Sequence, residues 1–255
     1  LTAIKKEHDI HFIAIATDYV SIPFWEETNP DYFIIPSKKL KEDFMKKGIK
    51  EEKLIPLGIP VELECSKDYK IEEVRKELNL NTDERYVLIL TGSMGFGNIL
   101  ELIEDLIKNI NNTNFIISCG SNKKLLENIQ NQYIGNERII ALPYTNKLNL
   151  YIKSADIVLT KPGGLTTTEI ATIGKPFIHT MPIPGCENYN ANFFQSLNMS
   201  LKCDTKEDVI KNTKILLNDK ALQKKMVENQ RKYINKNASM AIADFIDSKL
   251  KEKGE

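Results

Sequence analysis

The strongest constraint on the fold of this chain is a repeated pattern of a short apolar run, a turn and a longer amphipathic segment. Runs rich in Val, Ile and Leu alternate with lysine-rich segments of helical periodicity. This alternation is typical of βαβ units, so we predict an α/β fold with a parallel sheet and helices on both faces. The expected strands are residues 11–16, 32–36, 53–57, 86–90, 115–118, 138–142, 157–160 and 176–180. The expected helices are residues 37–47, 71–78, 99–110, 125–132, 147–153 and 167–173, and the C-terminal third is expected to be mostly helical.

The apolar pattern lapses at residues 58–70, which indicates a linker between two units. We therefore predict three parts: residues 1–62, residues 63–238 and a C-terminal helix over 239–255. The chain enters an apolar segment almost at once, without an initiator methionine. For this reason we expect residues 1–62 to be the last part of a domain that begins upstream.

Composition narrows the classes of function. The 255 residues contain 35 Lys and Arg and 35 Asp and Glu, so no global charge favours a nucleic-acid partner. The four cysteines are scattered, which fits reduced cytosolic thiols better than a zinc site. The three histidines stand apart from one another and are interpreted as surface or packing residues. No apolar run reaches the roughly 20 residues of a membrane span, and we expect a cytoplasmic location.

A first candidate site follows the expected strand 86–90, where Gly92, Ser93 and Gly95 precede a helix. Glycine permits close backbone approach, and a helix start presents free N–H groups, so this loop suits an anion such as phosphate. The spacing differs from the dinucleotide fingerprint and from a P-loop. A tight structural turn remains an equal alternative.

A second candidate site follows the strand 157–160, where Gly163 and Gly164 turn the chain and Thr166 begins a run of threonines. Threonine hydroxyls can cap a helix and bind an anion. Glu169 comes about one turn into the expected helix, from where a carboxylate can accept hydrogen bonds from the two hydroxyls of a ribose. Alternatively, Glu169 is a capping-box acid that bonds the N–H groups of its own helix.

Two further segments are candidates. Glu187 and Asn190 belong to a polar cluster after the last expected strand, which suits a hydroxyl-rich ligand or is an exposed loop. Asp18 follows the first strand and precedes Phe24 and Trp25. This group is either part of an acceptor site or a helix cap beside core aromatics.

Together these segments resemble the diacylglycerol glycosyltransferases of family 28, which include monogalactosyldiacylglycerol synthase and the processive diacylglycerol glucosyltransferases. The lipid II-forming glycosyltransferase is similar at a greater distance. The resemblance spans nearly the whole chain and is carried, in order, by TDYVSIPFW, LTGSMGFGN, ADIVLTKPGGLTTTEIATIGKPFI and PIPGCENYNANFF.

The resemblance implies a GT-B architecture, with two Rossmann-like domains flanking a cleft and a UDP-sugar bound by the second. Glu169 would hold the ribose, Tyr144 and Thr145 would cover the uracil, and Glu187 with Asn190 would touch the sugar or diphosphate. The residues implied to approach the diphosphate are Gly92, Ser93, Gly95, Gly163, Gly164 and Thr166. Cys186 stands where the family commonly has glutamine, which bears on the choice of sugar.

The implied chemistry is inverting transfer of a hexose from a UDP-sugar to a lipid hydroxyl such as that of diacylglycerol. Backbone N–H groups and helix starts would stabilise the leaving group, so neither a metal nor another cofactor is expected. Asp18 is the one acceptor-side acid available as a catalytic residue. Membrane contact, peripheral in kind, would come mainly from the missing N-terminal part. The alternatives are a donor-binding subunit that needs a partner domain, and a UDP-sugar 2-epimerase, which the motifs fit less well.

Overall fold

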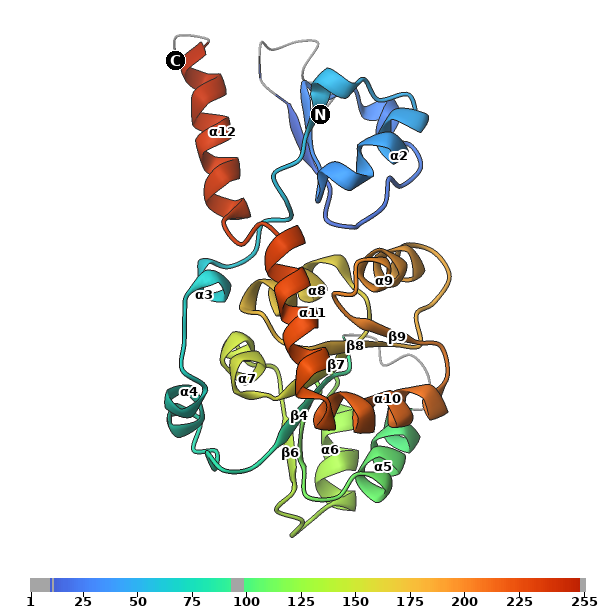
Figure 1. Ribbon diagram of the computed structural model, residues 1–255, viewed down its shortest axis with the longest axis vertical. Helices are drawn as coiled ribbons and strands as arrows, with labels where there is room; N and C mark the ends of the chain where they lie inside the picture. The colour runs from blue at the N-terminus through green and yellow to red at the C-terminus, as the bar shows by residue number, and fades with distance from the viewer. Residues whose placement is uncertain (1–9, 11, 93–98, 253–255) are drawn as a thin grey trace.

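The computed structural model describes residues 10, 12–92 and 99–252, which form two parallel sheets (Figure 1). The first sheet has the order β1-β2-β3 and the second has the order β6-β5-β4-β7-β8-β9. The strands of the first are β1 (Ile13–Ile15), β2 (Tyr32–Ile34) and β3 (Leu54–Ile55). Those of the second are β4 (Tyr86–Leu90), β5 (Asn114–Ser118), β6 (Ile139–Leu142), β7 (Ile157–Thr160), β8 (Phe177–Thr180) and β9 (Leu201–Cys203).

Helices connect the strands and cover the sheets. The helices of the first unit and the linker are η1 (Trp25–Thr28), η2 (Lys38–Leu40), α2 (Lys41–Lys46), η3 (Glu51–Lys53), α3 (Leu63–Ser66) and α4 (Ile71–Glu77). The helices of the second unit are α5 (Ile99–Asn109), α6 (Lys123–Gln132), α7 (Leu148–Ser154), α8 (Gly164–Ile173), α9 (Cys186–Ser196), α10 (Lys206–Asn218) and α11 (Lys220–Tyr233). The last helix is α12 (Ala238–Glu252).

Both faces of the six-stranded sheet are buried, because alternate residues of its strands point to opposite sides. On β4, Val87 packs with Ile103 of α5 in one apolar cluster. Its neighbour Leu88 packs with Ile152 of α7 and Ile170 of α8 in another. Helices α5, α6 and α10 therefore cover one face, and α7, α8 and α9 cover the other. The predicted α/β class is confirmed.

The order of the second sheet is that of a Rossmann fold. Numbered from β4, its strands lie in the order 3-2-1-4-5-6, so the direction of winding reverses between β4 and β7. Ligands of open α/β sheets bind at such a point, outside the carboxyl ends of the strands. The topology thus places the residues after β4 and after β7 side by side.

The chain crosses between the two units twice. After α11, Asn235 donates a hydrogen bond to the carbonyl of Leu57 at 2.7 Å, and Ser239 donates to the carbonyl of Val61 at 2.6 Å. Helix α12 then runs beside the first unit (Figure 1), where the ring of Phe245 meets the ring of Tyr32 edge-on at 5.2 Å. The C-terminal segment predicted as a separate part therefore packs on the first unit.

Some elements differ from the expectations. The predicted linker contains the short helix α3, and strand β9 lies in the part expected to be mostly helical. The helix expected from residue 167 begins at Gly164, one turn earlier. Within the described residues, none of the helices has the length and apolarity that a membrane span requires.

Candidate functional site

A cavity of about 570 Å³ lies at the switch point of the six-stranded sheet. Residues from the ends of β4, β5, β6 and β7 line it, together with the start of α8 and the loop before α9. They are Leu90, Thr91, Gly92, Ser118, Gly120, Ser121, Tyr144, Thr145, Leu148, Thr160, Lys161, Gly163, Thr166, Ile183 and Glu187. The structure thus brings six of the predicted site residues into one cavity: Gly92, Tyr144, Thr145, Gly163, Thr166 and Glu187.

The first glycine loop forms one wall. The hydroxyl of Thr91 donates to the carbonyl of Ser118 at 2.9 Å, which ties the end of β4 to the end of β5. Gly92 has a φ of +70°, which favours glycine, and no atom of the described residues lies within 4 Å of the position that a Cβ would take. A ligand can therefore approach this backbone closely. Ser93 and Gly95 lie outside the described residues, so their contacts stay predictions.

The second glycine loop forms the opposite wall. Gly163 precedes α8 and has open space where a Cβ would stand. Because α8 begins at Gly164, the threonines lie inside the helix and do not cap it. The Thr168 hydroxyl donates to the Gly164 carbonyl at 2.6 Å, and the Thr167 hydroxyl pairs with His179 Nε2 at 3.1 Å. Only Thr166 of the three threonines lines the cavity.

Two predicted residues after β6 also line the cavity. Tyr144 is 76% exposed, and its ring is available to cover a ligand. The Thr145 hydroxyl accepts a hydrogen bond from the backbone N–H of Lys147 at 3.1 Å, which shapes the turn before α7. Both residues follow β6, at one edge of the sheet, whereas α9 follows β8.

Glu187, in the first turn of α9, closes the cavity on the side of β8. Its carboxylate accepts a hydrogen bond from the backbone N–H of Ile183 at 3.1 Å, which folds the proline-rich loop back onto the helix. The second carboxylate oxygen has no hydrogen bond among the described residues. Cys186, the residue that replaces the family glutamine, does not line the cavity.

Glu169 has an unusual environment for a carboxylate. It lies on α8 one turn after Thr166, but unlike Thr166 it does not line the cavity. Within the described part of the chain, this half-buried side chain forms no hydrogen bond or ion pair, so the capping-box alternative is excluded. Burial raises the pKa of the Glu169 carboxyl, and the nearby Glu62 carboxylate raises this pKa further. A hydrogen-bond donor from a ligand would relieve this cost.

Asn190 and Asp18 lie against each other between the two units. The side-chain amide of Asn190 donates to Asp18 Oδ1 at 2.7 Å and to the Pro162 carbonyl at 2.9 Å. Its oxygen accepts from the backbone N–H of Tyr19 at 2.7 Å. Asn190 is fully buried, so its amide has no donor left for a sugar. The predicted contact of Asn190 with the sugar is therefore corrected to a contact between the units.

Gly164 belongs to the same junction. A Cβ at this position would lie 1.9 Å from the carbonyl oxygen of Thr17, so the loop after β1 packs directly on the helix start. The Tyr19 hydroxyl also pairs with the Thr168 hydroxyl at 2.8 Å. Gly164 therefore serves close packing and does not line the cavity. Asp18 caps none of the described helices, but Trp25 packs on Phe33 as a core aromatic.

One wall of the cavity was missed in the sequence. Ser118 ends β5, Gly120 and Ser121 follow it, and all three line the cavity beside the first glycine loop. Gly120 has a φ of +54°, and a glycine directly after a buried strand was an available signal.

The fold and the site define a class of protein: a Rossmann-like unit of the GT-B type with a ligand cavity at its switch point. Solved structures show the same fold. Acinetobacter baumannii MurG has a TM-score of 0.69 at 18% identity and covers 97% of this chain and 69% of that chain. A Neisseria meningitidis UDP-GlcNAc 2-epimerase bound to UDP-GlcNAc has a TM-score of 0.70 at 19% identity, over 94% and 70% of the two chains.

The chain belongs to the family of the glycosyltransferase family 28 C-terminal domain, which matches residues 86–247. The family described as monogalactosyldiacylglycerol (MGDG) synthase matches residues 1–61. A processive diacylglycerol beta-glucosyltransferase of Bacillus subtilis (strain 168) is 27% identical over 234 residues, which is 91% of this chain and 61% of that relative. The enzyme of the same name from Staphylococcus aureus (strain Newman) is 27% identical over 241 residues, 94% and 62% of the two. The chain thus spans about three fifths of these relatives.

Proposed function

We propose that this chain binds a UDP-sugar and forms the donor half of an inverting glycosyltransferase that transfers a hexose to a lipid such as diacylglycerol. The observation that carries the proposal is the cavity at the switch point, where two glycine loops and the start of α8 meet. Helix starts and bare glycine backbone are suited to a diphosphate. The family membership and the names of the relatives support the same assignment.

The residues of the candidate site divide by the chemistry that each offers. Gly92, Gly163 and Thr166 would bind the diphosphate through N–H and hydroxyl groups. The Tyr144 ring would cover the uracil, and the Glu169 carboxylate would accept bonds from the ribose. Glu187, on the far side of the cavity from Tyr144, would contact the sugar.

The main catalytic requirement of this reaction is stabilisation of the leaving diphosphate. As the bond to the sugar breaks, negative charge develops on the diphosphate, and the N–H groups at the start of α8 are oriented to stabilise it. The acceptor hydroxyl would attack from the opposite face of the sugar and invert its configuration. The structure gives Asp18 a partner in Asn190, so we do not propose it as the general base.

Calorimetric titration of the purified chain with UDP tests the donor site directly. Saturable one-to-one binding supports the proposal, and the absence of binding contradicts it. Incubation with UDP-glucose or UDP-galactose and diacylglycerol micelles then tests transfer, and the anomeric configuration of the product tests inversion. Binding without transfer would identify a donor-binding half that needs a partner domain.

The fold neighbours include UDP-GlcNAc 2-epimerases, so epimerase activity is measured in parallel. Incubation with UDP-GlcNAc followed by chromatography of the nucleotide sugars distinguishes the two chemistries. We expect unchanged UDP-GlcNAc in this assay. Formation of the 2-epimer would replace the transferase assignment.

A further inference from the structure

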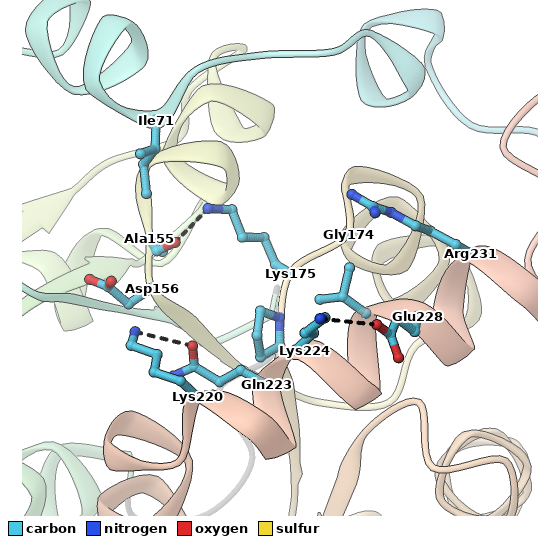
Figure 2. Close-up of a pocket in the computed structure, with 12 residues that line it drawn as sticks. Ile71, Ala155, Asp156, Gly174, Lys175, Lys220, Gln223, Lys224, Glu228 and Arg231 are labelled. Atoms are coloured by element: carbon cyan, nitrogen blue, oxygen red, sulfur yellow. Dashed lines mark hydrogen bonds and ion pairs between the residues drawn. The ribbon is translucent and has the colours of Figure 1, made fainter.

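A second cavity, of about 430 Å³, lies at the opposite edge of the six-stranded sheet (Figure 2). Asp156 immediately precedes β7 and Lys175 lies two residues before β8, so this hollow is at the amino ends of the strands. The donor cavity is at their carboxyl ends. Among the described residues the two cavities share none of their lining, and the second is not explained by the proposed function.

Four basic side chains line this hollow. Lys220, Lys224 and Arg231 follow one another along one side of α11, and Lys175 comes from the loop before β8 (Figure 2). Positions 220, 224 and 231 recur at helical spacing, which explains why one face of the helix carries them all. A basic stripe on an exposed helix is usually only solvated. Here the stripe faces a hollow that has a buried lysine in its wall.

The two acidic residues that line the hollow already form ion pairs with basic side chains. Asp156 forms an ion pair with Arg75 at 2.9 Å and accepts the backbone N–H of Tyr86 at 2.8 Å. Glu228 lies 3.9 Å from Lys224. Among the described residues, Lys175, Lys220 and Arg231 have no carboxylate partner. The hollow therefore carries an excess of positive charge in a chain that is neutral overall.

Lys175 is the most unusual of these residues, because it is 6% exposed. Its ammonium donates to the Ala155 carbonyl at 2.7 Å and lies 5.2 Å from the centre of the Tyr69 ring. The Lys175 ammonium has three N–H donors, and these contacts give it one hydrogen-bond acceptor and one aromatic ring face. A buried ammonium without a counter-ion is costly, and an anion in the hollow would reduce that cost.

We propose that this hollow is a second ligand site, which binds a phosphate group through Lys175 and Lys220, while Arg231, eleven residues further along α11, adds positive charge at the other end of the hollow. The group is either free phosphate or the phosphate of an anionic lipid head group, since both present the same oxygens to these donors. The site is independent of the donor cavity, so its test stands apart from that of the proposed function.

Phosphate binding at this site is coupled to protonation of Lys175. Burial is the main cause that lowers the pKa of Lys175, the Asp156 carboxylate opposes this shift, and the charges of Arg75 and Lys220 add to it, so that the pKa is about 7. Near neutral pH, a fraction of the Lys175 side chains is therefore uncharged in the free protein. A bound anion favours the charged form, so binding takes up a proton and weakens as the pH rises above 7.

Calorimetric titration of the chain with inorganic phosphate, in the presence of saturating UDP, is the primary test. Repeating it at about pH 8 in buffers of different ionisation enthalpy measures proton uptake. The double variant Lys220→Gln/Arg231→Gln should bind phosphate at least about tenfold more weakly, because one charge-assisted contact and a second positive charge of the hollow are lost. Lys225→Gln, which removes an exposed lysine of the same helix outside the hollow, is the matched control.

A second arm identifies the source of the phosphate. Flotation with vesicles of phosphatidylcholine alone, and with added phosphatidylglycerol, compares the wild-type chain with the same variants. Selective flotation with the anionic vesicles that is lost in the double variant assigns the site to a lipid head group, and binding of inorganic phosphate alone assigns it to a soluble ligand. Absence of binding in both arms overturns the proposal, as does binding that the double variant and Lys225→Gln retain equally.

Discussion

The amide of Asn190 donates a 2.7 Å hydrogen bond to the carboxylate of Asp18, across the boundary between the six-stranded unit and the first unit. The same amide holds the Pro162 carbonyl, which belongs to the loop that lines the donor cavity. One buried side chain therefore connects the first unit, the second glycine loop and α9. The shape of the donor cavity depends on this junction as well as on the sheet below it.

Replacing Asn190 should destabilise the chain. The Asn190→Ala variant loses three hydrogen bonds of this junction: those with Asp18, the Pro162 carbonyl and the Tyr19 N–H. We expect this loss to cost about 2–4 kcal/mol of unfolding free energy. Chemical denaturation measures this loss. Asn192→Ala, an exposed position on the same helix, should change stability by less than about 0.5 kcal/mol. Equal stabilities of the two variants would contradict the assigned role.

The two adjacent glycines of the second loop should respond differently to alanine. In Gly164→Ala the new Cβ would lie 1.9 Å from a backbone oxygen, so the first unit must shift, at a cost of about 1–3 kcal/mol. In Gly163→Ala the Cβ meets open space, and the loss should stay below about 1 kcal/mol. Thermal unfolding of both variants measures the difference. A Gly164→Ala variant as stable as Gly163→Ala would show that the contact with Thr17 is not required.

The sheet of the second unit was predictable because it depends on local pattern. Continuous apolar runs between glycine turns marked β4, β5, β7 and β8 within one or two residues. Strand β9 lacked this signal, since its sequence is Leu-Lys-Cys. Its place is set by pairing with β8, which is a tertiary contact.

The candidate site was predictable to the extent that its residues lie at strand ends. Strand order then brought Gly92, Tyr144, Gly163 and Glu187 into one cavity. The role of Asn190 could not be read from its neighbours in sequence. This role depends on Tyr19 and Asp18, which are separated from Asn190 by 171 and 172 positions in the sequence. No local sequence pattern indicates a contact between residues so far apart.

Glu169 is the residue whose replacement most directly tests the donor site. If its half-buried carboxylate accepts ribose hydroxyls, Glu169→Ala should lose about 1.5–3 kcal/mol of UDP binding free energy. Removing this half-buried acid, which has no hydrogen bond or ion pair among the described residues, should at the same time leave stability unchanged or raise it, because its desolvation cost disappears. Calorimetric titration with UDP measures the first effect and denaturation the second.

Glu127→Gln, at an exposed position on α6, is the control and should bind UDP like the wild-type chain. UDP affinity of Glu169→Ala equal to that of this control would remove Glu169 from the site. Greatly reduced stability of Glu169→Ala would instead indicate that the carboxylate has a structural partner.

His179 should make the chain sensitive to acid. Its ring is fully buried between the hydroxyls of Thr167 and Ser200, at 3.1 Å and 3.2 Å, which confirms its interpretation as a packing residue. Burial lowers the pKa of His179 to about 3, from 6.5 in the unfolded chain. Between these values the unfolded state binds the proton and the folded state does not, so stability falls as the pH falls.

The expected loss from this group is on the order of 3 kcal/mol between neutral pH and about pH 4.5. Urea denaturation over that range, compared for the wild-type chain and His179→Gln, isolates the contribution from that of the carboxyl groups. Because glutamine does not titrate and can keep one hydrogen bond to a hydroxyl, the variant should lose less stability on acidification. Parallel pH profiles for the two proteins would mean that His179 is protonated in the folded state without cost, contrary to its burial.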